Sequence, residues 1–146
     1  MLLLTLALGC ALSAHRVGLI HADGDAVELQ EPDGRTFTIP PSGDGALFGA
    51  LDRCVVDVRG PRLGRRLWVR DWQVQDAGDG SPPFVGRLRR YGGNWMIDDR
   101  RTGQPIVLDG KTVGQLAAWE GKLVLVRGLV VGAQTVAVVA WRPLEP

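Results

Sequence analysis

The stretch CVVDVRGPRLG, residues 54–64, has a counterpart later in the chain, LVLVRGLVVG, residues 123–132. In both stretches, two valines separated by one residue precede an Arg-Gly pair, and the two glycines, Gly60 and Gly128, lie 68 positions apart. The alternation of apolar and polar residues in the first stretch predicts a β-strand with one buried face. A phrase repeated at this spacing indicates that the chain contains the same structural unit twice.

The same offset aligns most of the remaining chain. It places the following pairs together: Val17-Gly18 with Val85-Gly86, Gly24 with Gly92, and residues 45–52 (GALFGALD) with residues 113–120 (VGQLAAWE). Order and spacing agree throughout, so the chain is predicted to be an internal duplication. The segment between the copies, QDAGDGSPPF, residues 75–84, is rich in Gly, Asp, Ser and Pro and is typical of a linker.

Each copy is expected to contain three strands, a short helical segment and two further strands. In the first copy these are residues 16–20, 26–30, 36–39, then 46–51, then 54–59 and 67–74. In the second copy they are residues 84–89, 94–98, 105–108, then 113–119, then 122–130 and 135–141. The glycine-containing segments between neighbouring strands are typical of tight turns.

This order of elements, with the Val-x-Val-Arg-Gly phrase in the fourth strand, resembles the OB-fold, a small five-stranded barrel. The resemblance implies an all-β protein with short helices, built as two tandem five-stranded barrels. The predicted organisation is a signal segment at 1–14, repeat 1 at 15–74, a linker at 75–83 and repeat 2 at 84–146. A pair of SH3-like barrels, or one barrel built from both halves, is the alternative.

The first residues, MLLLTLALGC, have the composition of a targeting segment. Leu2 to Leu8 are apolar except for Thr5, and Gly9-Cys10 follow. The segment resembles a bacterial lipoprotein signal, which implies a lipid on Cys10 and attachment to the membrane through that lipid only. Cleavage after Ala11 or Ala14 is the competing interpretation, and an N-terminal strand or helix of the fold is the third. The first two predict export, to the periplasm or to the outer membrane as an anchored lipoprotein.

Composition and motifs favour a binding protein over an enzyme. Hydrophobic residues make up 45% of the chain and charged residues 23%, which is typical of a globular protein. The net charge of +1 predicts no strong electrostatic attraction to nucleic acid. It has no Gly-rich phosphate loop, no paired histidines spaced for zinc and no nucleophile elbow. Cys54 begins an apolar strand, where a thiol is expected to act as a small hydrophobe. We therefore expect no catalytic residue, no metal and no cofactor.

The fold resemblance indicates where a ligand would lie. OB-folds bind single-stranded nucleic acid and oligosaccharides on strands two and three and the flanking loops. The residues expected on such a face are basic and aromatic: Arg87, Arg89, Tyr91, Arg100, Arg101, Arg65, Arg66, Trp68 and Trp72. The favoured function is a non-catalytic envelope module that binds or scaffolds another envelope protein, a glycan or a cell-wall component. The alternative is binding of single-stranded nucleic acid. A basic aromatic groove would favour nucleic acid, and an apolar patch would favour a protein.

The two copies differ in charge and in one strand face. From residue 15 to 80 there are eight arginines and eleven acids, a net of −3, whereas from residue 81 onward nine bases and five acids give +4. Opposite charge is expected to help the two repeats dock, within one chain or in a homodimer. In the second copy, Leu123 and Leu125 take outward positions, and Val107 and Val139 extend the apolar face. The pattern predicts that Leu125 and Val139 are buried by repeat 1, by the helix or by a partner subunit.

Overall fold

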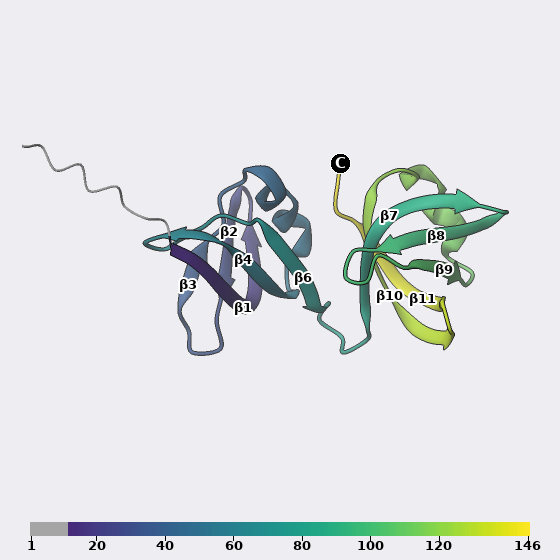
Figure 1. Cartoon of the computed structure of the whole chain (residues 1–146), viewed down its shortest axis with the longest axis horizontal. Helices are drawn as coiled ribbons and strands as arrows, with labels where there is room; N and C mark the ends of the chain where they lie inside the picture. The colour runs from purple at the N-terminus through teal and green to yellow at the C-terminus, as the bar shows by residue number, and fades with distance from the viewer. Residues whose placement is uncertain (1–11) are drawn as a thin grey trace, which may run out of the picture.

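The structure, a computed structural model, describes residues 12–146. Two β-sheets, each curled into a barrel, lie side by side along the long axis of the molecule (Figure 1). No strand of one sheet pairs with a strand of the other within these residues. The chain is therefore two tandem barrels and not one barrel built from both halves.

Barrel 1 is formed by the first copy. Its elements are β1 (Leu12–Asp23), β2 (Ala26–Gln30), β3 (Thr36–Thr38), the 3-10 helix η1 (Gly43–Leu51), β4 (Val55–Leu63), β5 (Arg66–Leu67) and β6 (Asp71–Asp76). The strand order is β1-β2-β3-β5-β4-β6, and pairing of β1 with β4 closes the ring. β3 and β5 are parallel, and all other neighbours are antiparallel.

Barrel 2 has the same connectivity. Its elements are β7 (Pro83–Tyr91), β8 (Asn94–Asp99), β9 (Pro105–Asp109), the 3-10 helix η2 (Val113–Trp119), β10 (Leu123–Gly132) and β11 (Thr135–Pro143). The barrel closes in the order β10-β11-β9-β8-β7, with β9 and β11 parallel. In both copies the first strand pairs with the second, the third pairs with the fifth, and the fourth pairs with both the fifth and the first. The prediction of tandem five-stranded OB-fold-like barrels is confirmed.

The glycine that ends the repeated phrase sits where two strands approach closely. A side chain at Gly60 would meet the backbone carbonyl oxygen of Trp68, and one at Gly128 would meet that of Ala137. Both contacts lie between the fourth and fifth strands of their barrels. Since only glycine lets the backbones approach this closely, the same residue is needed in each copy.

The fifth strand of barrel 1 differs from its prediction as one continuous strand over residues 67–74. It is divided into β5 and β6 by a bulge at residues 68–70. The bulge keeps its pairing, because Trp68 N donates to Pro61 O at 3.0 Å and Arg70 N donates to Arg59 O at 2.9 Å. The one extra residue brings the Trp68 carbonyl over Gly60 and turns Val69 into the core. β1 begins at Leu12, which pairs with Arg62, before the predicted start of repeat 1 at residue 15.

The first part of strand β10, residues 123–126, is buried on both faces and serves both barrels. Val124 and Val126 belong to the core of barrel 2. Leu123 and Leu125 point the other way and belong to the core cluster of barrel 1. Burial of Leu125, which is 1% exposed, confirms that prediction. The outward side of this strand is therefore a shared wall between the barrels.

The prediction that Val139 is buried was wrong. Its side chain is 59% exposed. β9 pairs with β11 only from Thr135 to Ala137, and Val139 lies beyond that pairing. Because barrel 1 packs against β10 and not against this part of β11, the outward valine stays in solvent.

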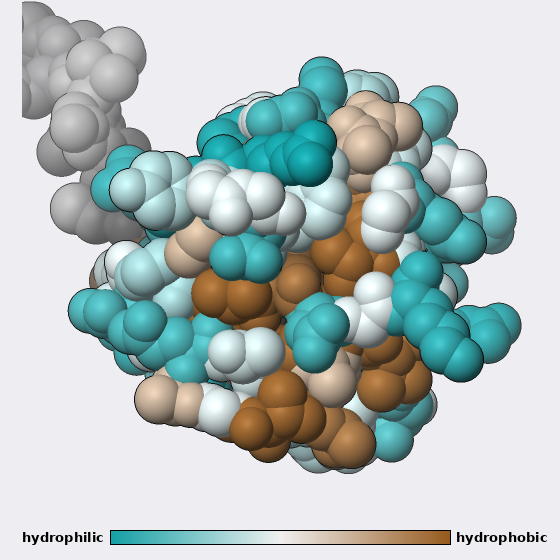
Figure 2. All heavy atoms as spheres, turned by 90° about the vertical axis from the view of Figure 1, so that its right-hand side faces the viewer, coloured by the Kyte–Doolittle hydropathy of each residue, from teal (hydrophilic) through white to brown (hydrophobic). Residues whose placement is uncertain are grey.

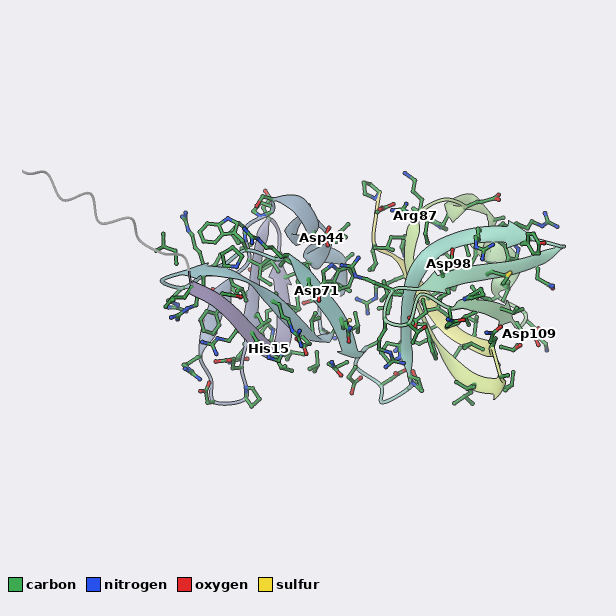
Figure 3. The ribbon with its side chains drawn as sticks, viewed as in Figure 1. His15, Asp44, Asp71, Arg87, Asp98 and Asp109 are labelled. Carbon is green, nitrogen blue, oxygen red and sulfur yellow. The ribbon has the colours of Figure 1, made fainter. Side chains whose placement is uncertain are left out.

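Polar contacts accompany the apolar ones between the barrels. Arg100 Nη2 lies 3.2 Å from Asp44 Oδ2. This ion pair joins the basic second copy to the acidic first copy. Arg142 Nη1 donates to the carbonyl oxygens of Ala50 and Asp52 at 2.9 and 3.1 Å. Asp44 lies on the side of barrel 1 that faces barrel 2 (Figure 3). Both arginines reach from barrel 2 to η1 or the residue that follows it, so they hold one side of barrel 1 against the shared wall.

Candidate partner-binding surface

The outer faces of strands two, three and five can be compared directly between the barrels, because their register is the same. In barrel 1, Glu28 is opposite Thr38, and Thr38 is beside Arg66. In barrel 2 the corresponding row is Met96, Val107 and Thr135. Each of the six side chains has a buried neighbour in its strand and points outward; the three in barrel 1 are exposed and the three in barrel 2 are half-buried. The same face is charged in barrel 1 and mostly apolar in barrel 2.

The hairpin between the fourth and fifth strands shows the same difference. The offset of 68 places Arg62-Leu63-Gly64-Arg65 of barrel 1 on Val130-Val131-Gly132-Ala133 of barrel 2. Leu129, Val130 and Val131 are all more than half exposed, so both sides of this hairpin are in solvent. Three consecutive exposed aliphatic residues are unusual at a turn, where polar residues dominate.

The β10–β11 hairpin points away from barrel 1, at the far end of the molecule (Figure 1). Figure 2 shows that hydrophobic side chains gather at this end, with hydrophilic ones between and around them. Because Thr135 at the start of β11 pairs with Val107, the hairpin adjoins the apolar row of β8 and β9. We call the set Met96, Val107, Leu129, Val130 and Val131 the apolar end.

The opposite edge of this face is formed by the β7–β8 hairpin. Tyr91 lies at its turn and is 70% exposed. The Arg90 guanidinium lies 5.6 Å from the centre of the Trp95 ring, a distance at which a cation and an aromatic face attract. Trp95 packs against the core of barrel 2, so Arg90 and Trp95 lie on the inner side of these strands, whereas Arg89, which pairs with Met96, and Tyr91 lie on the outer side with the apolar row.

Several of the basic residues expected to bind a ligand are paired with acids instead. Arg87 lies 3.1 Å from Glu145, and Arg89 lies 2.8 Å from Asp98. The Arg87 guanidinium, together with the Leu123 N–H, holds the pKa of the Glu145 carboxyl below its ordinary value. Figure 3 shows Arg87 and Asp98 on the barrel 2 side of the molecule. Pairing reduces the positive charge that these arginines present to a ligand.

The expected aromatic and basic residues do not form one groove. Trp72 is 1% exposed, so its assignment to a binding face was wrong: the ring fills the barrel 1 core, with its edge against Phe48. Arg100 is exposed, and its guanidinium lies over this buried ring. The remaining candidates divide between barrels: Arg65, Arg66 and half-buried Trp68 lie on barrel 1, and Tyr91 and Arg101 on barrel 2.

The residues of the apolar end were missed because each one alone is an ordinary strand residue. The signal that could have found them is the comparison of copies. Where copy one has Pro61, Arg62 and Leu63, copy two has Leu129, Val130 and Val131 in front of the same glycine turn. Alternation ends there, which indicates that both sides of the hairpin are apolar.

The groups that could carry chemistry lie elsewhere or are inaccessible. Cys54 is fully buried, and burial raises the pKa of its thiol, which disfavours the reactive thiolate. Residues 12–146 contain no group of three or more His, Cys, Asp or Glu side chains arranged to hold a metal ion. The same part of the chain has no helix that is long and apolar enough to cross a membrane. The lipidation candidate Cys10 lies outside the residues that the structure describes.

Comparison with known proteins gives no information about a ligand for this surface. No protein-family model matches the chain, and no curated protein is significantly similar to it in sequence. The fold is two tandem OB-fold-like barrels, and the two copies differ in the chemistry of their outer faces.

Proposed function

We propose that this protein is a non-catalytic binding module that holds a protein partner on the apolar end of barrel 2. The observation that supports this best is the exposure of Leu129, Val130 and Val131 beside the apolar row of β8 and β9. Apolar patches that adjoin a polar rim on a soluble protein are typical of interaction sites. Barrel 1 acts as a scaffold that holds the shared wall of barrel 2.

The partner that fits is a protein segment with aliphatic side chains flanked by carboxylates. Aliphatic groups would cover the apolar end, at about 1.5–3 kcal/mol for each side chain that becomes fully buried. Carboxylates would suit the +4 net charge of the second copy. Charge of opposite sign steers the encounter and sets its register more than it raises affinity.

A peptide library displayed on phage tests the proposal on the full chain. The matched pair of variants is Val131→Ser and Leu63→Ser, because both residues occupy the same place in the two hairpins and are 60% and 64% exposed. We expect enrichment of peptides with clustered aliphatic residues, whose binding weakens about tenfold in Val131→Ser and is unchanged in Leu63→Ser. Failure to enrich such peptides, or equal binding to both variants, would overturn the proposal.

Single-stranded nucleic acid is the second candidate, favoured by exposed Tyr91 and the Arg90–Trp95 stack. A thymidine oligonucleotide serves as the probe, since stacking on aromatic side chains does not depend on base sequence. Binding that weakens in Tyr91→Ala but not in Val131→Ser would favour nucleic acid and count against the protein-binding proposal.

We also propose that the module works outside the cytosol, tethered through Cys10 or released by cleavage. The apolar run from Leu2 to Leu8 and the Gly9-Cys10 pair support this. Cleavage after Ala11 would leave β1 whole, whereas cleavage after Ala14 would remove its first three residues. Metabolic labelling with a fatty acid in a bacterium tests the tether: label on the wild type and none on Cys10→Ser supports it. An unlabelled protein that retains Met1 would contradict both export and the tether.

A further inference from the structure

Barrel 1 has a hollow beside its own β4–β5 hairpin, at the site that corresponds to the apolar hairpin of barrel 2. Its volume is about 390 Å³, within the range of small-molecule sites. The lining residues are Gly34, Arg35, Thr36, Phe37, Arg62, Gly64 and Arg65. Three of the seven are arginines and none is acidic.

The charges around this hollow do not balance. Arg35 Nε lies 2.7 Å from Asp33 and 3.2 Å from Glu31, so its charge is compensated. Glu31 also lies 3.7 Å from Arg16, whose guanidinium lies 5.2 Å from the centre of the Phe37 ring. Within residues 12–146, neither Arg62 nor Arg65 forms an ion pair. Two positive charges are left at the opening.

The two uncompensated guanidinium groups are held in place by neutral partners. Arg65 Nε donates to Thr36 O at 3.2 Å, and its Nη2 donates to the Thr36 hydroxyl. The Arg62 guanidinium lies 6.0 Å from the centre of the Phe37 ring. Phe37 itself is buried, so the floor of the hollow is apolar. An apolar floor strengthens the attraction of a guanidinium for an anion, because it excludes water from one side.

These arginines are not required by the fold. The offset of 68 places Arg62 on Val130 and Arg65 on Ala133. The same barrel architecture forms in the second copy without either charge. The pair is therefore a feature of copy one alone.

We propose that this hollow binds a tetrahedral oxyanion, a phosphate or sulfate group that is free or carried as an ester. Arg65 keeps Nη1 available, and the Arg62 guanidinium has no hydrogen-bond partner among residues 12–146. Guanidinium groups bind such oxygens through parallel N–H···O hydrogen bonds. The site lies on barrel 1 and the apolar end lies on barrel 2, so the oxyanion proposal is tested independently of the protein-binding proposal.

Nuclear magnetic resonance titration of the full chain with inorganic phosphate tests the site. The probes are the backbone amides of Gly34 and Gly64 and the Nε–H groups of Arg62 and Arg65. We expect saturable shifts at these positions. Arg62→Gln and Arg65→Gln are each expected to weaken the binding about tenfold, as loss of a charge-assisted hydrogen bond would do. Arg70→Gln removes the same charge from an exposed site on the same barrel and is expected to change affinity less than twofold.

Four further outcomes decide the source and nature of the anion. Methyl phosphate that binds at the same positions shows that an ester is accepted, as the proposal states. Acetate that binds as tightly as phosphate, or shifts that do not saturate at millimolar concentrations, would overturn it. Equal weakening in Arg70→Gln would also overturn it, because the effect would then be general charge attraction. The Arg62 side chain makes no hydrogen bond within residues 12–146, so its variant gives an answer even if Arg65→Gln unfolds the barrel.

Discussion

The guanidinium of Arg100, in the turn between β8 and β9, lies 4.6 Å from the centre of the Trp72 ring in barrel 1. Asp44 Oδ2 orients both groups: it accepts a hydrogen bond from Trp72 Nε1 at 2.9 Å and from Arg100 Nη2 at 3.2 Å. One carboxylate of η1 therefore fixes an indole of its own barrel and a cation of the other. This contact joins the two copies at residues whose types, taken alone, suggest a ligand site.

Substitution of Arg100 is expected to weaken the contact between barrels. Arg100→Gln should lower the free energy of unfolding by about 1–2 kcal/mol, because a partly buried cation–π contact and a half-exposed ion pair are lost together. Urea denaturation measures the change. The neighbouring Arg101 is exposed, and Arg101→Gln should change the free energy by less than about 0.5 kcal/mol. Equal effects of the two substitutions would show that the contact contributes nothing to stability.

Leu125→Asp tests the shared wall. It would place an unpaired charge among the buried side chains of the barrel 1 core cluster, so we expect a loss of about 3 kcal/mol or more in urea denaturation. The reciprocal change at the corresponding position of copy one, Asp57→Leu, should cost less than about 1 kcal/mol, since it removes only the exposed pair with His15. Unchanged stability of Leu125→Asp would remove the argument that β10 joins the barrels.

The repeated glycines should tolerate no side chain. Gly60→Ala and Gly128→Ala are each expected to cost at least about 2 kcal/mol, because the new methyl group overlaps a backbone carbonyl that strand pairing holds in place. Gly49 in η1 has open space around it, so Gly49→Ala should be neutral or stabilising by about 0.4–1 kcal/mol. Thermal unfolding distinguishes the two classes. A tolerated alanine at Gly60 would refute the explanation given for the repeated phrase.

Glu145 should make stability depend on pH in the acid range. The hydrogen bond from Arg87, with that from the Leu123 N–H, lowers the pKa of this carboxyl below its ordinary value of about 4.3. The stabilisation is therefore fully present above the unfolded-state pKa and is lost as pH falls through the lower pKa of the folded state. Glu145→Gln should be less stable than the wild type at neutral pH and should approach it in acid. Exposed Glu120→Gln is the control, and a constant difference across pH for Glu145→Gln would contradict the assignment.

Much of the architecture can be predicted from the sequence because the duplication lets each strand and helix be predicted from two separate stretches of the chain. Alternation shows the inward face of β4, and the Arg-Gly pair marks the close approach to the fifth strand. Copy comparison also indicated that Leu125 is covered. The bulge at residues 68–70 could not be foreseen, since it depends on a carbonyl of one strand crossing a glycine of another.

The candidate site was less accessible to sequence reasoning. Arginine and tryptophan suit ligand binding in general, but Trp72 faces the core and Arg100 faces the neighbouring barrel. The direction of such side chains is set by the packing of the two barrels against each other. Local sequence patterns do not predict this packing. The apolar hairpin emerges only when exposure is known, because Leu129, Val130 and Val131 could equally have lain in a buried strand.

Hydrogen exchange with and without a peptide selected from the library tests most directly the central claim, that the apolar end of barrel 2 is the partner-binding surface. The account predicts slower exchange at the amides of residues 129–131 and along β8 and β9 when the peptide is bound, with residues 61–63 of the barrel 1 hairpin unchanged. Slower exchange at residues 61–63 with no change at residues 129–131 would contradict it.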